Sequence, residues 1–147
     1  MLSEETNESR VAVSLRDDIE ILIVEDEPGH YKLIEHCLRK AGIENEIAWF
    51  EDGKSVLDFL CGGGPASGKG KKYIMLLDIR MPGVDGIEVL RKIKQEEDWD
   101  HIHVIMLTTS DDQQQARLCY DLGCEAHMIK PPGKSLLAAI KRIAARL

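Results

Sequence analysis

The chain has 147 residues, of which 44% are hydrophobic and 31% charged, and its formal net charge is −7. This length and composition predict one globular domain with a core of its own. The negative charge argues against a nucleic-acid-binding surface, which would need clustered lysine and arginine. No apolar run approaches a membrane span, and the start, MLSEETNESR, lacks the features of a secretion signal. We therefore expect a cytoplasmic protein without a membrane partner.

The first elements of the chain predict a strand followed by a helix. Residues 1–18 are polar and aperiodic, which predicts a flexible tail ahead of a domain over 19–147. IEILIV at 19–24 is an almost continuous apolar run, typical of a strand buried on both faces of a parallel sheet. Pro28 favours a helix start and Gly42 a helix end, and apolar residues repeat at helical spacing between them.

The same alternation continues along the rest of the chain. Further strands are predicted at 45–50, 73–78, 103–108 and 126–129. Helices are predicted over 52–61, around 87–93, around 116–123 and over 134–147. The glycine-rich stretch 62–72 predicts a flexible loop. Strands that alternate with helices in this way predict an α/β fold, a (βα)₅ doubly wound parallel five-stranded sheet.

Three of the predicted strands end in polar residues. The first is followed by Glu25 and Asp26, the third ends in Asp78, and the fourth ends in Thr108. Ligands of open α/β sheets bind beyond the carboxyl ends of the strands, so these side chains should converge. Crowded carboxylates repel one another unless a cation lies among them, and Mg²⁺ suits a site of oxygen ligands. The alternative of solvated loop acids stays open, most of all for Glu25 taken alone.

Lys130 follows the fifth predicted strand and so belongs to the same edge. Its ammonium can pair with Asp78 at rest and with a phosphoryl oxygen after transfer. Asp78 can be the nucleophile, and the Thr108 hydroxyl can donate to another oxygen. This set predicts phosphoryl transfer, although Thr108 and Lys130 taken singly also fit an ordinary strand-end threonine and a surface lysine.

Two other patterns predict no chemistry. Gly63, Gly68 and Lys69 nearly form a nucleotide-binding P-loop, but Gly70 replaces its Ser or Thr, and a helix rather than a strand precedes it. No nucleotide or other organic cofactor is therefore expected. The cysteines form no C-x-x-C pair and are expected to be reduced apolar residues. They are Cys37, Cys61, Cys119 and Cys124.

Four segments resemble the signature segments of bacterial response-regulator receiver domains. They are ILIVEDEP, LLDIRMPGVDG, IMLTTS and MIKPP, in the family's order, and the resemblance covers residues 19–147. It implies a flavodoxin-like (βα)₅ fold in a single-domain response regulator. Such a protein receives a phosphoryl group from a histidine kinase or phosphotransfer protein and catalyses only its own phosphorylation and dephosphorylation. The resemblance makes Asp78 the phosphoacceptor and Glu25 and Asp26 the acidic pair at the Mg²⁺.

The resemblance also assigns the remaining residues of the site. The backbone carbonyl of Arg80 becomes a further Mg²⁺ ligand, Thr108 the switch hydroxyl, and Lys130 the signature lysine before a cis bond to Pro131. The second switch position, on the fifth strand, usually carries Tyr or Phe, and here it is His127. At the second switch position the chain therefore departs from the family's pattern.

The loop of residues 62–72 is longer than is usual in the family. A long loop there is similar to the free-standing subgroup that partners phytochrome-type histidine kinases. Output is expected through protein contacts, with a homodimer through the last helix and fifth strand as one form. The alternative is that the wide apolar stripe of that helix only widens its core contact.

Three rival functions fit the sequence less well. An FMN protein of the same fold order would cradle a phosphate in the first strand–helix loop, but Glu25, Asp26 and Glu27 would repel it. A phosphatase that forms an aspartyl-phosphate would want a second carboxylate at position 80, which is Arg. A receiver fold that is never phosphorylated would lack the acidic pair or the lysine, and this chain has both.

Overall fold

The computed structural model describes residues 15–62 and 71–147. Its five strands form one parallel sheet in the order β2-β1-β3-β4-β5. The strands are β1 Ile19–Val24, β2 Ile47–Phe50, β3 Lys72–Asp78, β4 Ile102–Thr108 and β5 Ala126–Ile129. The helices are α2 Pro28–Lys40, α3 Gly53–Cys61, α5 Gly86–Gln95, the 3₁₀ helix η1 Glu97–Trp99, α6 Gln113–Leu122 and α7 Gly133–Ala144. The predicted (βα)₅ fold is confirmed.

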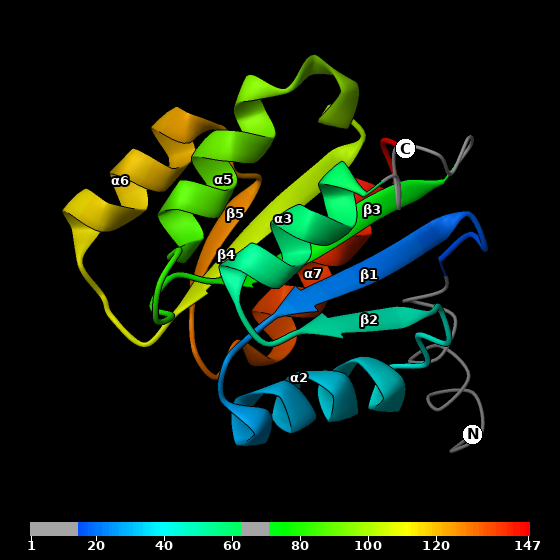
Figure 1. Cartoon of the computed structure of the whole chain (residues 1–147). Coiled ribbons are helices and arrows are strands. Elements are labelled where there is room, and N and C mark those ends of the chain that lie inside the picture. The colour runs from blue at the N-terminus through cyan, green and yellow to red at the C-terminus, as the bar shows by residue number, and fades with distance from the viewer. Residues whose placement is uncertain (1–14, 63–70) are drawn as a thin grey trace, which may run out of the picture.

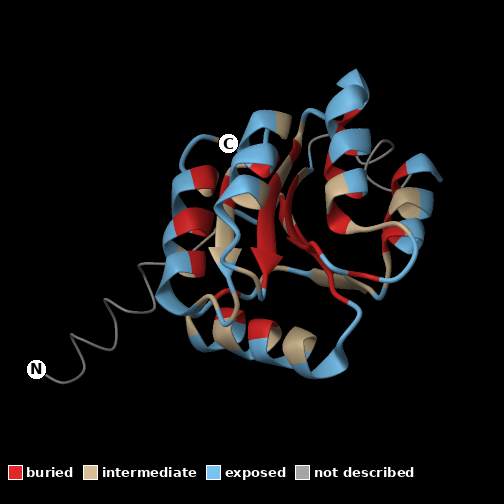
Figure 2. Ribbon diagram, turned by 90° about the vertical axis from the view of Figure 1, so that its left-hand side faces the viewer, coloured by how far each residue is buried: buried red, intermediate tan, exposed pale blue. Residues whose placement is uncertain are grey.

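Helices cover both faces of the sheet, α2 and α7 on one and α3, α5 and α6 on the other (Figure 1). Alternate residues of each strand face opposite layers. The strand residues packed with α3, α5 and α6 include Leu22, Val24, Met75, Leu77, Val104 and Met106. Those packed with α2 and α7 include Ile21, Ile23, Ile74, Leu76, Ile105 and Leu107. The strands are therefore apolar on both faces, and Figure 2 shows the buried residues along them and on the inner sides of the helices.

Most predicted elements lie within two or three residues of the observed ones. The second strand begins at Ile47 rather than 45. The side chain of Asn45 instead donates hydrogen bonds to the carbonyls of Arg16 and Ile19, each at 2.8 Å, and so ties the turn to the start of β1. The last helix ends at Ala144, and the short helix η1 was not predicted. The P-loop-like stretch and most of the expected tail lie outside the described residues.

The connection from β3 to α5 explains the glycines of the second signature segment, LLDIRMPGVDG. Gly83 has φ 76°, a left-handed conformation that favours glycine. At Gly86 a Cβ atom would lie 2.2 Å from the Asp78 carbonyl oxygen, so only glycine fits. The Asp85 carboxylate accepts the Glu88 N–H at 2.9 Å and caps α5. The start of α5 is thereby pressed against the end of β3, where Asp78 lies.

The apolar stripe of α7 is used by the core. Leu136, Ile140 and Ile143 are buried, and Leu137 and Leu147 pack partly buried against the same cluster. This packing favours the wider core contact over a free apolar face, while the homodimer stays a prediction. The four cysteines are free. Among the described residues, no helix is both long and apolar enough to cross a bilayer.

Candidate functional site

The carboxyl edge of the sheet gathers three acidic side chains. Glu25 and Asp26 follow β1, and Asp78 ends the neighbouring strand β3. One carboxylate oxygen from each of the three lies within 4.8 Å of the others. Glu25 is 1% exposed and Asp78 6%, whereas Asp26 is exposed. The structure thus brings the predicted carboxylates together, with two buried and one facing solvent.

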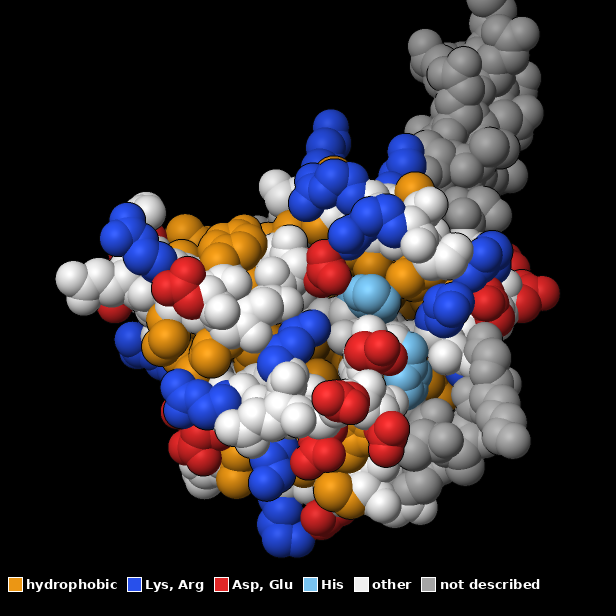
Figure 3. Space-filling view, turned by 90° about the horizontal axis from the view of Figure 1, so that it is seen from above, with side chains coloured by type: hydrophobic (Ala, Val, Ile, Leu, Met, Phe, Trp, Pro, Cys, Tyr) orange, Lys and Arg blue, Asp and Glu red, His pale blue; other side chains and the backbone are white. Residues whose placement is uncertain are grey.

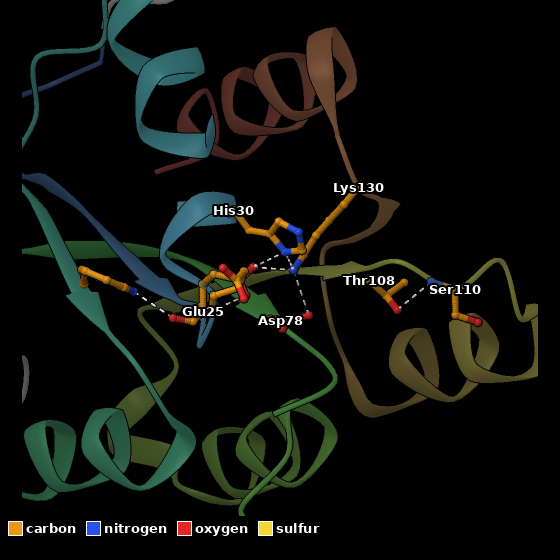
Figure 4. Close-up of polar contacts among 8 residues, drawn as sticks. Glu25, His30, Asp78, Thr108, Ser110 and Lys130 are labelled. Atoms are coloured by element: carbon orange, nitrogen blue, oxygen red, sulfur yellow. Dashed lines mark hydrogen bonds and ion pairs between the residues drawn. The ribbon is translucent and has the colours of Figure 1, made fainter. Parts of the chain in front are cut away.

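Lys130 reaches into this cluster from the end of β5 (Figure 4). Its Nζ lies 3.2 Å from Asp78 Oδ1 and also donates a hydrogen bond to Glu25 Oε1. The lysine side chain is only 8% exposed. The Lys130–Pro131 peptide bond is cis, as the resemblance implied. The expected pair with Asp78 is present, and the second pair with Glu25 was not expected.

The protonation of Asp78 reflects this surrounding. The pKa of its carboxyl is raised from 3.8 to about 6, mainly by burial and also by the negative Glu25, while the Lys130 ammonium lowers it. Near pH 7 the Asp78 carboxylate is therefore mainly ionised, as a nucleophile must be. The Lys130 ammonium balances its negative charge only in part.

His30 is a neighbour of the site that the sequence did not single out. Its Nδ1 lies 3.3 Å from Lys130 Nζ and 3.8 Å from Glu25 Oε1. A neutral Nδ1 without a proton accepts a hydrogen bond from the ammonium, which then touches two carboxylates and one imidazole. One feature of the sequence could have indicated His30: it lies in the first turn of the helix that follows the acidic loop, two residues after Pro28.

Thr108 and His127 lie on the neighbouring strands β4 and β5. Thr108 is fully buried, and its hydroxyl oxygen accepts the Ser110 N–H at 3.1 Å. Figure 4 shows this hydroxyl turned toward Ser110, to one side of Asp78. The His127 side chain is half-buried, and burial lowers its pKa. Thr108 thus ends the strand next to the one that carries Asp78, and His127 lies one strand further, on β5, while their switch roles remain predictions.

Arg80 lies two residues beyond Asp78 and is exposed. The expected role of its carbonyl as a ligand stays a prediction.

The donor set suits a hard divalent cation. All three acidic residues offer oxygen atoms, which Mg²⁺ prefers. Three ionised carboxylates and one ammonium leave two negative charges, which one divalent cation would balance. The exposure of Asp26 leaves an open side toward solvent, so that water molecules can complete the coordination. The residues present therefore fit Mg²⁺ at this edge.

A parallel (βα)₅ sheet with acidic residues and a lysine at its carboxyl edge defines the receiver class of signalling domains. The family model described as the response regulator receiver domain matches residues 21–141. The chain belongs to the response regulator receiver domain family.

Several relatives of the chain have been named or solved. The probable methanogenesis regulatory protein FilR2 of Methanothrix harundinacea is 39% identical over 118 residues, 78% of this chain and 74% of that protein. The bacteriophytochrome response regulator AtBRR has a structure with TM-score 0.72 and 32% identity, covering 91% of this chain and 95% of its own. Response regulator Rcp1 of Synechocystis is 31% identical over 88% of this chain and 82% of its own. The Mn²⁺-bound form of Rcp1 superposes with TM-score 0.67 over 84% and 90% of the two chains.

Proposed function

We propose that this protein is a response regulator that accepts a phosphoryl group from a histidine kinase or phosphotransfer protein onto Asp78, in a Mg²⁺-dependent reaction. One observation carries the proposal. Asp78 is a buried carboxylate at a strand end, placed between an acidic cluster open to solvent and the ammonium of Lys130, 3.2 Å away. Family membership supports phosphoryl acceptance in general, and this geometry supports Asp78 as the residue that accepts the phosphoryl group.

The proposed chemistry is a simple displacement. A carboxylate oxygen of Asp78 attacks the phosphorus atom of the donor, and the bond from phosphorus to the donor's leaving group breaks. The leaving group takes the electron pair and a proton from the solvent. Lys130 and the Thr108 hydroxyl stabilise the phosphoryl oxygens, and positioning supplies most of the remaining catalysis. The protein catalyses only its own phosphorylation and the later hydrolysis, and in this sense it is not an enzyme with a separate product.

Mg²⁺ is proposed as the cofactor, held by Asp26, Asp78 and Glu25 with the backbone carbonyl of Arg80. When bound, it neutralises oxygens of the transferring phosphoryl group. The relative Rcp1 has a structure in a Mn²⁺-bound form, which supports divalent-cation binding by a protein of this family. The buried Glu25 acts mainly by holding Lys130, and the exposed Asp26 faces the side from which ion and donor arrive.

The proposed donor is a phytochrome-type histidine kinase, because three of the similar proteins are described as phytochrome or bacteriophytochrome response regulators. Output is proposed through protein contacts, with a homodimer through α7 and β5 as one form. Figure 3 shows acidic and basic side chains side by side on one face, which supports a protein partner rather than nucleic acid there. The cytoplasmic location stays a prediction.

The proposed switch joins Thr108 with His127. A phosphoryl group on Asp78 adds about 1.5 to 2 negative charges and draws the Thr108 hydroxyl away from Ser110. The space that Thr108 vacates is then open to the ring at position 127. The backbone N–H of His127 donates a hydrogen bond to the Tyr120 hydroxyl at 3.1 Å, so a shift of His127 is transmitted to α6.

Intact mass after incubation with a small-molecule phosphodonor tests this function. Wild type with Mg²⁺ should gain one phosphoryl adduct, and chelation should abolish it. Asp78→Asn should gain none, whereas the matched control Asp121→Asn, at an exposed aspartate of α6, should label normally. Undiminished labelling of Asp78→Asn would refute the assignment.

A further inference from the structure

The backbone of Glu25 is held by the edge strand β2. The Glu25 N–H donates to the Phe50 carbonyl at 3.0 Å, which extends the β1–β2 ladder by one residue. The Glu25 carbonyl accepts the indole N–H of Trp49 at 2.8 Å. Both backbone polar groups of Glu25 are therefore hydrogen-bonded to the same strand. The side chain projects into the carboxylate cluster from a backbone that is held on both sides.

The Trp49 ring also contacts the helix that follows the acidic loop. It stacks on Tyr31 with ring centroids 4.2 Å apart and planes inclined by 3°. Tyr31 lies in the first turn of α2, and its N–H donates to the Glu27 carbonyl at 3.0 Å. Trp49 thus joins three segments, namely β2, the end of β1 and the start of α2. The loop with Glu25, Asp26 and Glu27 spans the latter two.

The loop is short, and apart from the hydrogen bond that Lys130 donates to the Glu25 carboxylate, its other described hydrogen bonds are local. The Glu27 N–H donates to Glu25 Oε2 at 3.2 Å, which orients the carboxylate but does not anchor the loop to the sheet. Asp26 is exposed, so little packing holds it. Its position therefore depends on the fixed residues on either side. The indole hydrogen bond holds the preceding residue, and the aromatic stack holds the helix after it.

We propose that Trp49, stacked on Tyr31, is a positioning residue of the cation site, which sets the place of the Glu25–Asp26 loop before any ion arrives. The inference rests on the proposed Mg²⁺ site and deepens it. Because the indole is bonded to the peptide of a cluster residue, Trp49 fluorescence reports occupation of the site by the ion. Trp49 is not itself a ligand of the ion, and it acts through its hydrogen bond to the Glu25 carbonyl and its stack on Tyr31.

Mg²⁺ titration of the unphosphorylated full chain tests this role. Trp49→Phe keeps a ring for the stack and removes the indole N–H, so the Kd for Mg²⁺ by calorimetry should rise about three- to tenfold, the equivalent of one hydrogen bond. Tyr31→Leu removes the stack and should raise the Kd in the same direction. Tyr31→Phe loses only the hydroxyl bond to Glu35 and should bind Mg²⁺ like wild type.

Trp99 provides the matched control. It is the only other tryptophan, it is 7% exposed, and it lies in η1 before β4, at the opposite edge of the sheet. Trp99→Phe should keep wild-type Mg²⁺ affinity and keep a fluorescence response to Mg²⁺. Trp49→Phe, which retains Trp99, should lose that response. Thermal unfolding without Mg²⁺ shows that each variant is folded at the titration temperature, and a purely structural role would lower stability without moving the Kd.

The outcomes separate the two proposals. Wild type that binds Mg²⁺, with Trp49→Phe and Tyr31→Leu binding as tightly as Trp99→Phe, would overturn the positioning role and leave the proposed function intact. A fluorescence response to Mg²⁺ that persists in Trp49→Phe would overturn the claim that Trp49 fluorescence reports ion binding, and would also leave the proposed function intact. Wild type that binds no Mg²⁺ would overturn the proposed cation site, and the positioning role with it.

Discussion

The ends of β1 and β4 flank the proposed phosphoacceptor and are held in opposite ways. Glu25, after β1, has its N–H, its carbonyl and both carboxylate oxygens engaged, by Phe50, Trp49, Glu27 and Lys130. Thr108, at the end of β4, is equally buried, but its hydroxyl has one described bond, to the Ser110 N–H. One site therefore combines a rigid side, at Glu25, with a movable side, at Thr108, whose hydroxyl is held by a single described hydrogen bond.

The largest effect should come from Lys130, which neutralises the rigid side. Lys130→Met keeps an unbranched side chain, one atom shorter, and removes the charge, so Glu25 and Asp78 face each other buried and unpaired. Without Mg²⁺ at pH 8, the free energy of unfolding should fall by about 3 kcal/mol. Urea unfolding measures this loss, and saturating Mg²⁺ should restore much of it.

Lys130→Arg is the matched control because it keeps the positive charge, and it should lose less stability than Lys130→Met. An equal fall in the free energy of unfolding of the two variants would show that the packing of the Lys130 side chain, and not its charge, stabilises the Glu25 side of the site.

The next effect concerns pH. The raised pKa of Asp78, about 6 against 3.8, means that the folded metal-free protein binds this proton more tightly than the unfolded chain does. The resulting stability is fully present below pH 3.8 and is lost as pH rises through 6. Asp78→Asn cannot ionise, so at pH 8 it should be more stable than wild type by about 1 to 3 kcal/mol. Melting in chelator at pH 5 and pH 8 measures this gain, which should shrink at the lower pH.

Asp26 separates ion binding from folding. It is exposed, unlike Glu25, so Asp26→Ala should leave the metal-free melting temperature unchanged or slightly higher, since carboxylate repulsion falls. Its Kd for Mg²⁺ should rise about tenfold or more, because a charged ligand is lost. Calorimetry measures this Kd, with Asp121→Asn as the control. Unaltered affinity would remove Asp26 from the proposed ligands.

The smallest effect on stability is expected at the movable side. Thr108→Val replaces the hydroxyl with a methyl group of similar size and leaves the Ser110 N–H without its acceptor, a loss of about 1 kcal/mol. Phosphorylation by a small-molecule donor should persist at a reduced rate, because Lys130 remains. Any phosphorylation-dependent change in self-association or partner binding, measured by light scattering and pull-down, should disappear. Persistence of that change would place the switch elsewhere.

The sequence predicted those parts of the molecule that depend on local pattern. Apolar runs separated by helical periods predicted the strands, and parallel strands necessarily bring Asp26 and Asp78 to one edge. The second contact of Lys130, with Glu25, could not be read this way, because it depends on the depth to which each side chain is buried. His30 and Trp49 were missed for the same reason. Nothing in their local sequence indicates which atoms they approach from α2 and β2, and only the folded arrangement supplies those partners.

The contact between Gly86 and the Asp78 carbonyl has a consequence for mutational tolerance. A saturation scan of the chain should find position 86 as intolerant as position 78, although no reaction passes through it. At 78 the demand is for a particular functional group. At 86 it is for the absence of one, because even a methyl group would push α5 away from the backbone that carries the acceptor. Loss of activity alone would not tell these two kinds of constraint apart.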